Sequence, residues 1–121
     1  MNVLEVKVGQ TIEASLDQFG ATLQAAMAGD AVTPHFGVGF RSMSQFGEVF
    51  TAKRWELIEA LKASGAMSIY ALAKQLKRNY SNVHKDVTVL SEWLVIEKDE
   101  AGKVFVPLDE IDVRWPLKKA A

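Results

Sequence analysis

The spacing of apolar residues changes twice within the first 50 residues. Residues 4–8 alternate apolar and charged side chains, which is typical of a β-strand with one buried face. Apolar residues then recur every three or four positions from a helix cap at Thr11 to a stop at Gly29, and residues 35–40 alternate again. The stripe of the expected helix consists of Ile12, Leu16, Phe19, Leu23 and Met27. We therefore expect a strand, a helix and a second strand, followed by a short helix behind Ser42.

From Thr51 onward the spacing is helical three times in succession. Thr51, Ser68 and Asn79 are each placed to cap a helix, and Gly65 ends the first of the three. In the third helix the inward stripe is Val83, Val87, Leu90 and Leu94. Residues 95–108 contain two β-branched runs around an acidic tip with a glycine, which predicts a hairpin, and residues 111–115 predict a further edge strand.

The order helix, helix, short turn, helix, hairpin is typical of a winged helix-turn-helix. We therefore expect an α+β, mainly α, protein that contains this fold, with three helices and a β-hairpin wing. Residues 51–121 form the expected winged helix-turn-helix domain, and residues 1–50 form an N-terminal strand-helix-strand extension.

The charge distribution adds a polyanion-binding surface to this picture. The whole chain has a net charge of −1, but residues 53–85 hold seven cations and two acids and so carry +5. Residues 1–50 and residues 86–121 each carry −3. A basic segment between acidic flanks is the electrostatic pattern of a DNA-binding surface. The simpler interpretation is an ordinary solvated helix face.

A helical wheel of the third helix indicates which side chains could read DNA. With the apolar stripe turned inward, five polar side chains face outward or lie on the shoulders of the helix, and their donors and acceptors suit base edges in the major groove. These are Ser81, Asn82, His84, Lys85 and Thr88. The competing interpretation is that Asn79, Ser81 or Asn82 only caps the helix, and that His84 is an ordinary solvent-facing residue.

Other residues are better placed to contact the DNA backbone than the bases. The expected phosphate contacts, which would set the position of the helix, are Lys53, Arg54, Lys74, Lys77, Arg78 and Tyr80. The hairpin carries Lys98 and Lys103 around Asp99 and Glu100, and it has no arginine to enter a minor groove. We therefore expect the wing to contribute weakly to binding.

The composition argues against several other classes of protein. The chain has no cysteine, only two histidines and no HExxH, GxSxG or phosphate-loop motif, so we expect no metal site, no cofactor and no catalysis. No apolar run approaches the roughly 20 residues needed to span a bilayer. We expect a soluble cytoplasmic protein that does not bind membranes.

The stretches LAKQLKRNYSNVHKDVTVL, IEKDEAGKVFVP and DEIDVRWPL resemble a family of small prokaryotic winged-helix transcriptional regulators, distantly similar in form to MarR-type proteins. The resemblance implies a DNA-binding autoregulator, and some of these proteins look like antitoxins that also bind a toxin protein. Such proteins usually carry glycine where the third helix ends, and here that position is Leu94. A left-handed leucine would cost about 1 kcal/mol, so we expect the helix to end differently.

Regulators of this kind commonly bind double-stranded DNA as homodimers, with two recognition helices in successive major-groove faces. The stripe from Ile12 to Met27 is the candidate dimer or partner interface, although it could instead pack on its own chain. The alternative function is a protein–protein interaction module that uses a winged-helix scaffold without binding DNA.

Overall fold

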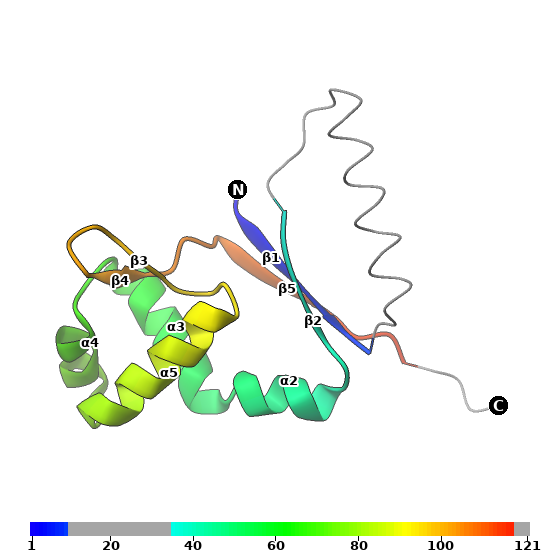
Figure 1. Ribbon diagram of the computed structural model, residues 1–121, viewed down its shortest axis with the longest axis horizontal. Helices are drawn as coiled ribbons and strands as arrows, with labels where there is room; N and C mark the ends of the chain where they lie inside the picture. Colours follow the sequence, from blue (N-terminus) through cyan, green and yellow to red (C-terminus); the bar gives the residue numbers. More distant parts are fainter. Residues whose placement is uncertain (10–34, 118–121) are drawn as a thin grey trace. The chain divides into compact units, whose positions relative to one another are not determined.

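A computed structural model of the protein describes residues 1–9 and 35–117 (Figure 1). These residues form a mixed α+β structure. In chain order its elements are β1 Val3–Val8, β2 His35–Phe40, α2 Met43–Val49, α3 Ala52–Ser64, α4 Ile69–Leu76, α5 Tyr80–Glu92, β3 Glu97–Lys98, β4 Val104–Phe105 and β5 Glu110–Arg114. The helix expected from Thr11, with its apolar stripe, lies outside the described residues. None of the described helices is long and apolar enough to cross a membrane.

The chain divides into two compact units. One unit, here called the sheet unit, comprises Met1–Phe46 and Glu110–Ala121, and the other, the helical unit, comprises Gly47–Asp109. This division differs from the expected boundary after residue 50, because β5 pairs with β1 and thereby returns the end of the chain to the first unit. The helical unit is therefore an insertion between two strands of one sheet.

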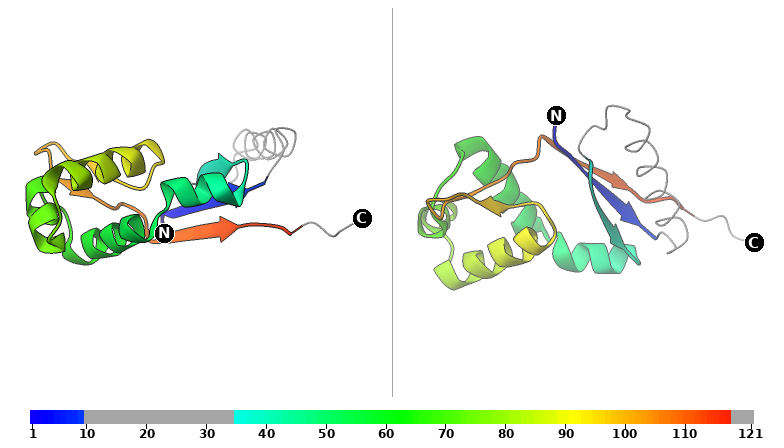
Figure 2. Two further views of the ribbon diagram at one scale, coloured as in Figure 1. Left: turned by 90° about the horizontal axis from the view of Figure 1, so that it is seen from below. Right: turned by 45° about the horizontal axis from the view of Figure 1, so that its top comes forward.

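The described residues of the sheet unit form three parallel strands in the order β2-β1-β5 (Figures 1 and 2). Leu4 is level with Phe36 and Ile111, and Val6 is level with Val38 and Val113. The central strand β1 follows the alternation expected from the sequence, because Leu4, Val6 and Val8 are fully buried while the residues between them are half-buried. The strands predicted near residues 4–8, 35–40 and 111–115 are thus confirmed.

The helices of the helical unit begin where their caps predict. The hydroxyl of Thr51 accepts a hydrogen bond from the Arg54 N–H, and the hydroxyl of Ser68 accepts one from the Ala71 N–H. Asn79 Oδ1 accepts hydrogen bonds from the N–H groups of both Ser81 and Asn82. The apolar faces of the three helices share one core with the hairpin; its buried side chains include Leu57, Leu61, Leu72, Val83, Leu90, Val95 and Val104.

The hairpin is held at both ends by backbone hydrogen bonds. At the tip, the Gly102 N–H donates to the Asp99 carbonyl at 3.0 Å, and Gly102 has a φ of 82° that suits glycine. Asp99 Oδ1 also accepts from the N–H groups of Ala101 and Lys103. Toward the helices, Met67 and Val104 exchange two backbone hydrogen bonds of 3.1 and 2.8 Å. The hairpin is therefore fastened to the segment between α3 and α4.

The end of α5 corrects two expectations about Leu94. The Leu94 N–H donates to the Ser91 carbonyl and the Val95 N–H donates to the Leu90 carbonyl, which is the Schellman pattern of a helix end. Leu94 has a φ of 68°, so the left-handed residue stands where glycine is usual, and the helix does not end differently. Leu94 is also 45% exposed rather than part of the inward stripe, because the chain reverses before it. The burial of Leu90 and Val95 against the core holds this conformation despite its cost.

We expect Leu94→Gly to stabilise the protein relative to Leu94→Ala by about 1 kcal/mol, because both variants lose the same exposed side chain and only glycine relieves the left-handed backbone. Urea denaturation of the two variants measures this difference. Equal midpoints, or a less stable glycine variant, would mean that Leu94 does not carry the strain described here.

Candidate nucleic-acid interface

The outward face of α5 is polar and open to solvent. The five side chains expected to read DNA, Ser81, Asn82, His84, Lys85 and Thr88, are all exposed. The side chain of Asn79 caps the helix, so the side chains of Ser81 and Asn82 do not serve as the cap. The first turns of α5 therefore present hydroxyl, amide and ammonium groups on one surface.

Two of these five residues make contacts along the helix itself. The hydroxyl of Thr88 donates to the His84 carbonyl at 2.9 Å, one turn earlier. The imidazole of His84 lies against the Tyr80 ring, with 5.9 Å between ring centroids. His84 and Thr88 lie on the side of α5 that lines a pocket together with hairpin residues, whereas Ser81, Asn82 and Lys85 do not line it.

This pocket is a groove between α5 and the hairpin. It has a volume of about 440 Å³. Its lining includes His84 and Thr88 from α5 and Lys98 from β3, above the apolar side chains of Val87 and Ile96. The fold thus brings two of the expected base-reading residues together with one expected wing residue, although they come from separate parts of the sequence.

The inward face of α5 contains an acid among its apolar residues. Asp86 is 8% exposed and lies in the helix between Val83 and Leu90, which are fully buried. Its two carboxylate oxygens accept from different arginines: Oδ1 from Arg54 Nε at 3.0 Å, and Oδ2 from Arg78 Nη2 at 2.7 Å. One carboxylate therefore joins α5 to α3 and to the turn between α4 and α5.

The Arg54 guanidinium also closes the end of another helix. Its Nη1 donates to the carbonyls of Glu48 and Val49, the last two residues of α2, at 3.1 and 2.9 Å. The last carbonyls of a helix have no hydrogen-bond donor within the helix itself, so an arginine is well suited to donate to them. Only 12% of the Arg54 side chain and 19% of the Arg78 side chain is exposed. Both arginines were expected to contact phosphates, but the fold engages them with Asp86.

The other expected backbone contacts remain on the surface. Lys53 lies in the first turn of α3, Lys74 near the end of α4, and Lys77 in the turn before α5; all three are exposed, as is Tyr80. Lys77 adopts a left-handed conformation with a φ of 56°, and the N–H groups of Lys77 and Arg78 close α4. The turn thus joins the two helices within three residues and leaves the Lys77 side chain exposed.

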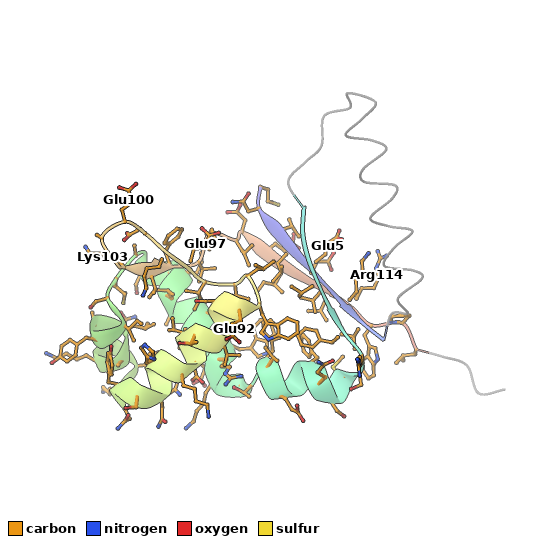
Figure 3. The ribbon with its side chains drawn as sticks, viewed as in Figure 1. Glu5, Glu92, Glu97, Glu100, Lys103 and Arg114 are labelled. Carbon is orange, nitrogen blue, oxygen red and sulfur yellow. The ribbon has the colours of Figure 1, made fainter. Side chains whose placement is uncertain are left out.

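The tip of the hairpin is more acidic than basic. Lys98 and Lys103 are exposed, but Glu97, Asp99 and Glu100 lie among them and are exposed as well. Figure 3 shows Glu100 projecting from the loop between β3 and β4, and Lys103 lower on the same loop. The Asp99 carboxylate is occupied by the backbone of the turn. The hairpin is therefore held in shape by an acid and presents little net positive charge.

Asp86 was not among the residues predicted from the sequence to shape this region. The signal was present, since an acid at position 86 interrupts an otherwise apolar face that runs through Val83, Val87 and Leu90. A charge on such a face is rarely buried unless it is paired. The identity of the partners could not be read from the sequence, because Arg54 is 32 residues away.

Comparisons with known proteins identify the family of this chain. A model of the family HVO_A0114 matches residues 49–113, which is more than half of the chain and includes α3, α4, α5 and the hairpin. The chain therefore belongs to the HVO_A0114 family. No curated protein and no solved structure matches it.

We expect Asp86→Asn to destabilise the protein by about 3 kcal/mol, because it leaves two poorly exposed guanidinium groups without their counter-charge. The matched control is Glu59→Gln, which removes an exposed acid from α3. Urea denaturation followed by circular dichroism measures both. A loss as small as that of the control would show that the carboxylate does not hold these elements together.

Proposed function

We propose that the helical unit is a winged helix-turn-helix that binds double-stranded DNA and that the protein is a transcriptional regulator. In this proposal α4, the three-residue turn and α5 are the helix-turn-helix, and the β3–β4 hairpin with the Met67 bridge is the wing. The major groove admits an α-helix, and α5 is the helix that enters it.

One observation carries the proposal: α5 has a fixed inner face and an exposed polar outer face. Val83, Val87 and Leu90 anchor the helix in the core, and Asp86 joins it to two other segments. Since side chains on a helix are 100° apart, this anchoring determines which residues point outward. Ser81, Asn82 and Lys85 can then donate to or accept from base edges, as asparagine does with adenine and lysine with guanine.

The expected phosphate contacts are the surface residues of the basic segment that Asp86 does not engage. Lys53, Lys74, Lys77 and Tyr80 are exposed and can position the protein on the backbone, where each neutralised phosphate releases counterions. Arg54 and Arg78 act as positioning residues through Asp86. The wing contributes weakly, because acidic side chains surround Lys98 and Lys103. His84 and Thr88 of α5 and Lys98 of β3 line one groove, which supports a wing that lies beside the reading helix.

The resemblance to small MarR-like regulators extends the proposal. It supports a homodimeric repressor that acts on its own gene, and it suggests an antitoxin that also binds a small toxin protein. The support for this part of the proposal is that residues 71–90 and the hairpin sequence resemble those of such regulators. A purified complex of the protein with the product of a neighbouring small gene would test the antitoxin role separately from DNA binding.

We expect Asn82→Ala combined with Lys85→Ala to lower the preference for a duplex selected from a random library over an unselected duplex by about tenfold or more. The reason is that a good side-chain contact to a base contributes about 1–3 kcal/mol of discrimination. Fluorescence anisotropy with both duplexes at several salt concentrations measures the preference. The matched control is Lys62→Ala, because Lys62 is also an exposed lysine but contacts the Val106 carbonyl and Asp109.

Two results would contradict the proposal. One is that the intact protein binds no duplex, or binds with an affinity that does not respond to salt, since phosphate contacts require a steep dependence. The other is that the control variant loses as much discrimination as the double variant. Circular dichroism of each variant excludes unfolding as the cause.

A further inference from the structure

Within residues 1–9 and 35–117, the outer side of β5 is an edge of the sheet. The order of the strands that these residues form is β2-β1-β5, so among them β5 has a neighbouring strand on one side only (Figure 1). An edge strand presents a row of backbone donors and acceptors to any chain that can pair with it. Three large apolar side chains near this edge are exposed: Val113 at 39%, Trp115 at 50% and Leu117 at 76%.

The direction of the backbone groups on β5 can be assigned. The Glu110 N–H donates to the Asn2 carbonyl at 3.3 Å, so Glu110 faces β1. Successive residues of a strand direct their backbone groups to opposite sides. Asp112 and Arg114 therefore also face β1, while the N–H and carbonyl groups of Ile111 and Val113 point to the open edge. The same alternation, continued one residue past the end of β5, directs the backbone groups of Trp115 to this edge as well. None of these three residues is proline, so all three can pair.

We propose that a second copy of this chain pairs with this edge, with the two β5 strands antiparallel and centred on Val113. In this register Val113 lies opposite Val113 of the second copy, and Ile111 lies opposite Trp115 of the second copy. All four of these residues use outward-facing backbone groups, as an antiparallel ladder requires. The interface is related by a two-fold axis and joins the two sheets into one of six strands.

Charge complementarity favours this register over the one centred on Ile111. Within one chain, like charges lie level across the β1–β5 pair, Glu5 with Asp112 and Lys7 with Arg114. The proposed pairing places Asp112 opposite Arg114 of the second copy, and the two-fold axis repeats this contact. A register centred on Ile111 would instead place Asp112 opposite Glu110, and like charges that lie directly opposite are destabilising.

The side chains of β5 also divide between a charged face and an apolar face of the sheet. Asp112 and Arg114 share one face of the sheet with Glu5 and Lys7, and these four residues line a common shallow pocket. Glu5 and Arg114 are labelled in Figure 3. Ile111 and Val113 lie on the other face, level with the buried Leu4 and Val6. The second copy therefore adds opposite charges on the charged face and apolar pairs on the apolar face, which is why it fits this edge better than an arbitrary strand.

Analytical ultracentrifugation of the full chain over a range of concentrations tests the pairing without DNA. We expect a dimer for the natural sequence. Asp112→Arg alone and Arg114→Asp alone should each raise the dissociation constant by roughly tenfold or more, because each replaces two attractive pairs by two repulsive ones. The double variant Asp112→Arg/Arg114→Asp should restore the dimer, because it exchanges the charges within each pair. Both substituted residues are exposed, and circular dichroism of each variant verifies that it is folded.

Three outcomes would overturn the inference. The first is a natural protein that stays monomeric at high concentration, which would leave the edge to a strand of another protein. The second is a dimer that neither single reversal weakens, which would place the interface elsewhere. The third is a double variant that remains monomeric, which would exclude this register. These outcomes are independent of DNA binding, so failure here leaves DNA binding to its own test. A monomer would also contradict the homodimeric repressor, whereas the second and third outcomes concern only the position of the interface.

Discussion

The contact of Asp86 with Arg54 and Arg78 is the interaction on which the arrangement of the helical unit depends. A single carboxylate on the inner face of α5 accepts from α3 and from the turn before α5, and Arg54 continues this network to the end of α2. Apolar packing alone tolerates small rotations of a helix, whereas two charge-assisted hydrogen bonds to different segments restrict them. The rotation of α5 about its own axis determines which side chains reach solvent, so the buried acid indirectly positions the exposed polar face.

This interaction also changes how the basic segment is understood. Seven cations between residues 53 and 85 suggested a uniform DNA-binding surface, yet two of them are engaged by an acid just beyond that segment. The cations that remain exposed are lysines, including Lys53, Lys74, Lys77 and Lys85. Lysine acts as a compact point charge, whereas arginine forms directed forks. The two arginines therefore fix the geometry of the helical unit, and in the proposed function the exposed lysines are the residues that attract the polyanion. The number of cations in a sequence is therefore a poor count of available phosphate contacts.

Local features of the fold could be predicted from the sequence, and non-local ones could not. The caps at Thr51, Ser68 and Asn79 and the alternation in β1 depend on neighbouring residues, and the structure confirms them. The partners of Asp86 and the pairing of β5 with β1 depend on contacts between distant segments, which periodicity does not encode. Leu94 illustrates a third case: the cost of a left-handed leucine predicted a different helix end, and this prediction was wrong because tertiary packing overrode the backbone propensity. For the candidate site, exposure of the α5 face was predictable, while its alignment with Lys98 in one groove was not.

The central claim is that the outward face of α5 meets a DNA duplex. The most direct measurement is a titration of the isotope-labelled protein with a short duplex, followed by amide chemical shifts at low and then moderate salt. The account predicts that the largest changes occur at Ser81, Asn82 and Lys85 and in the turn around Lys77, and that added salt reverses them. Changes confined to the strands of the sheet unit, or none at the start of α5 while the duplex is bound, would contradict it.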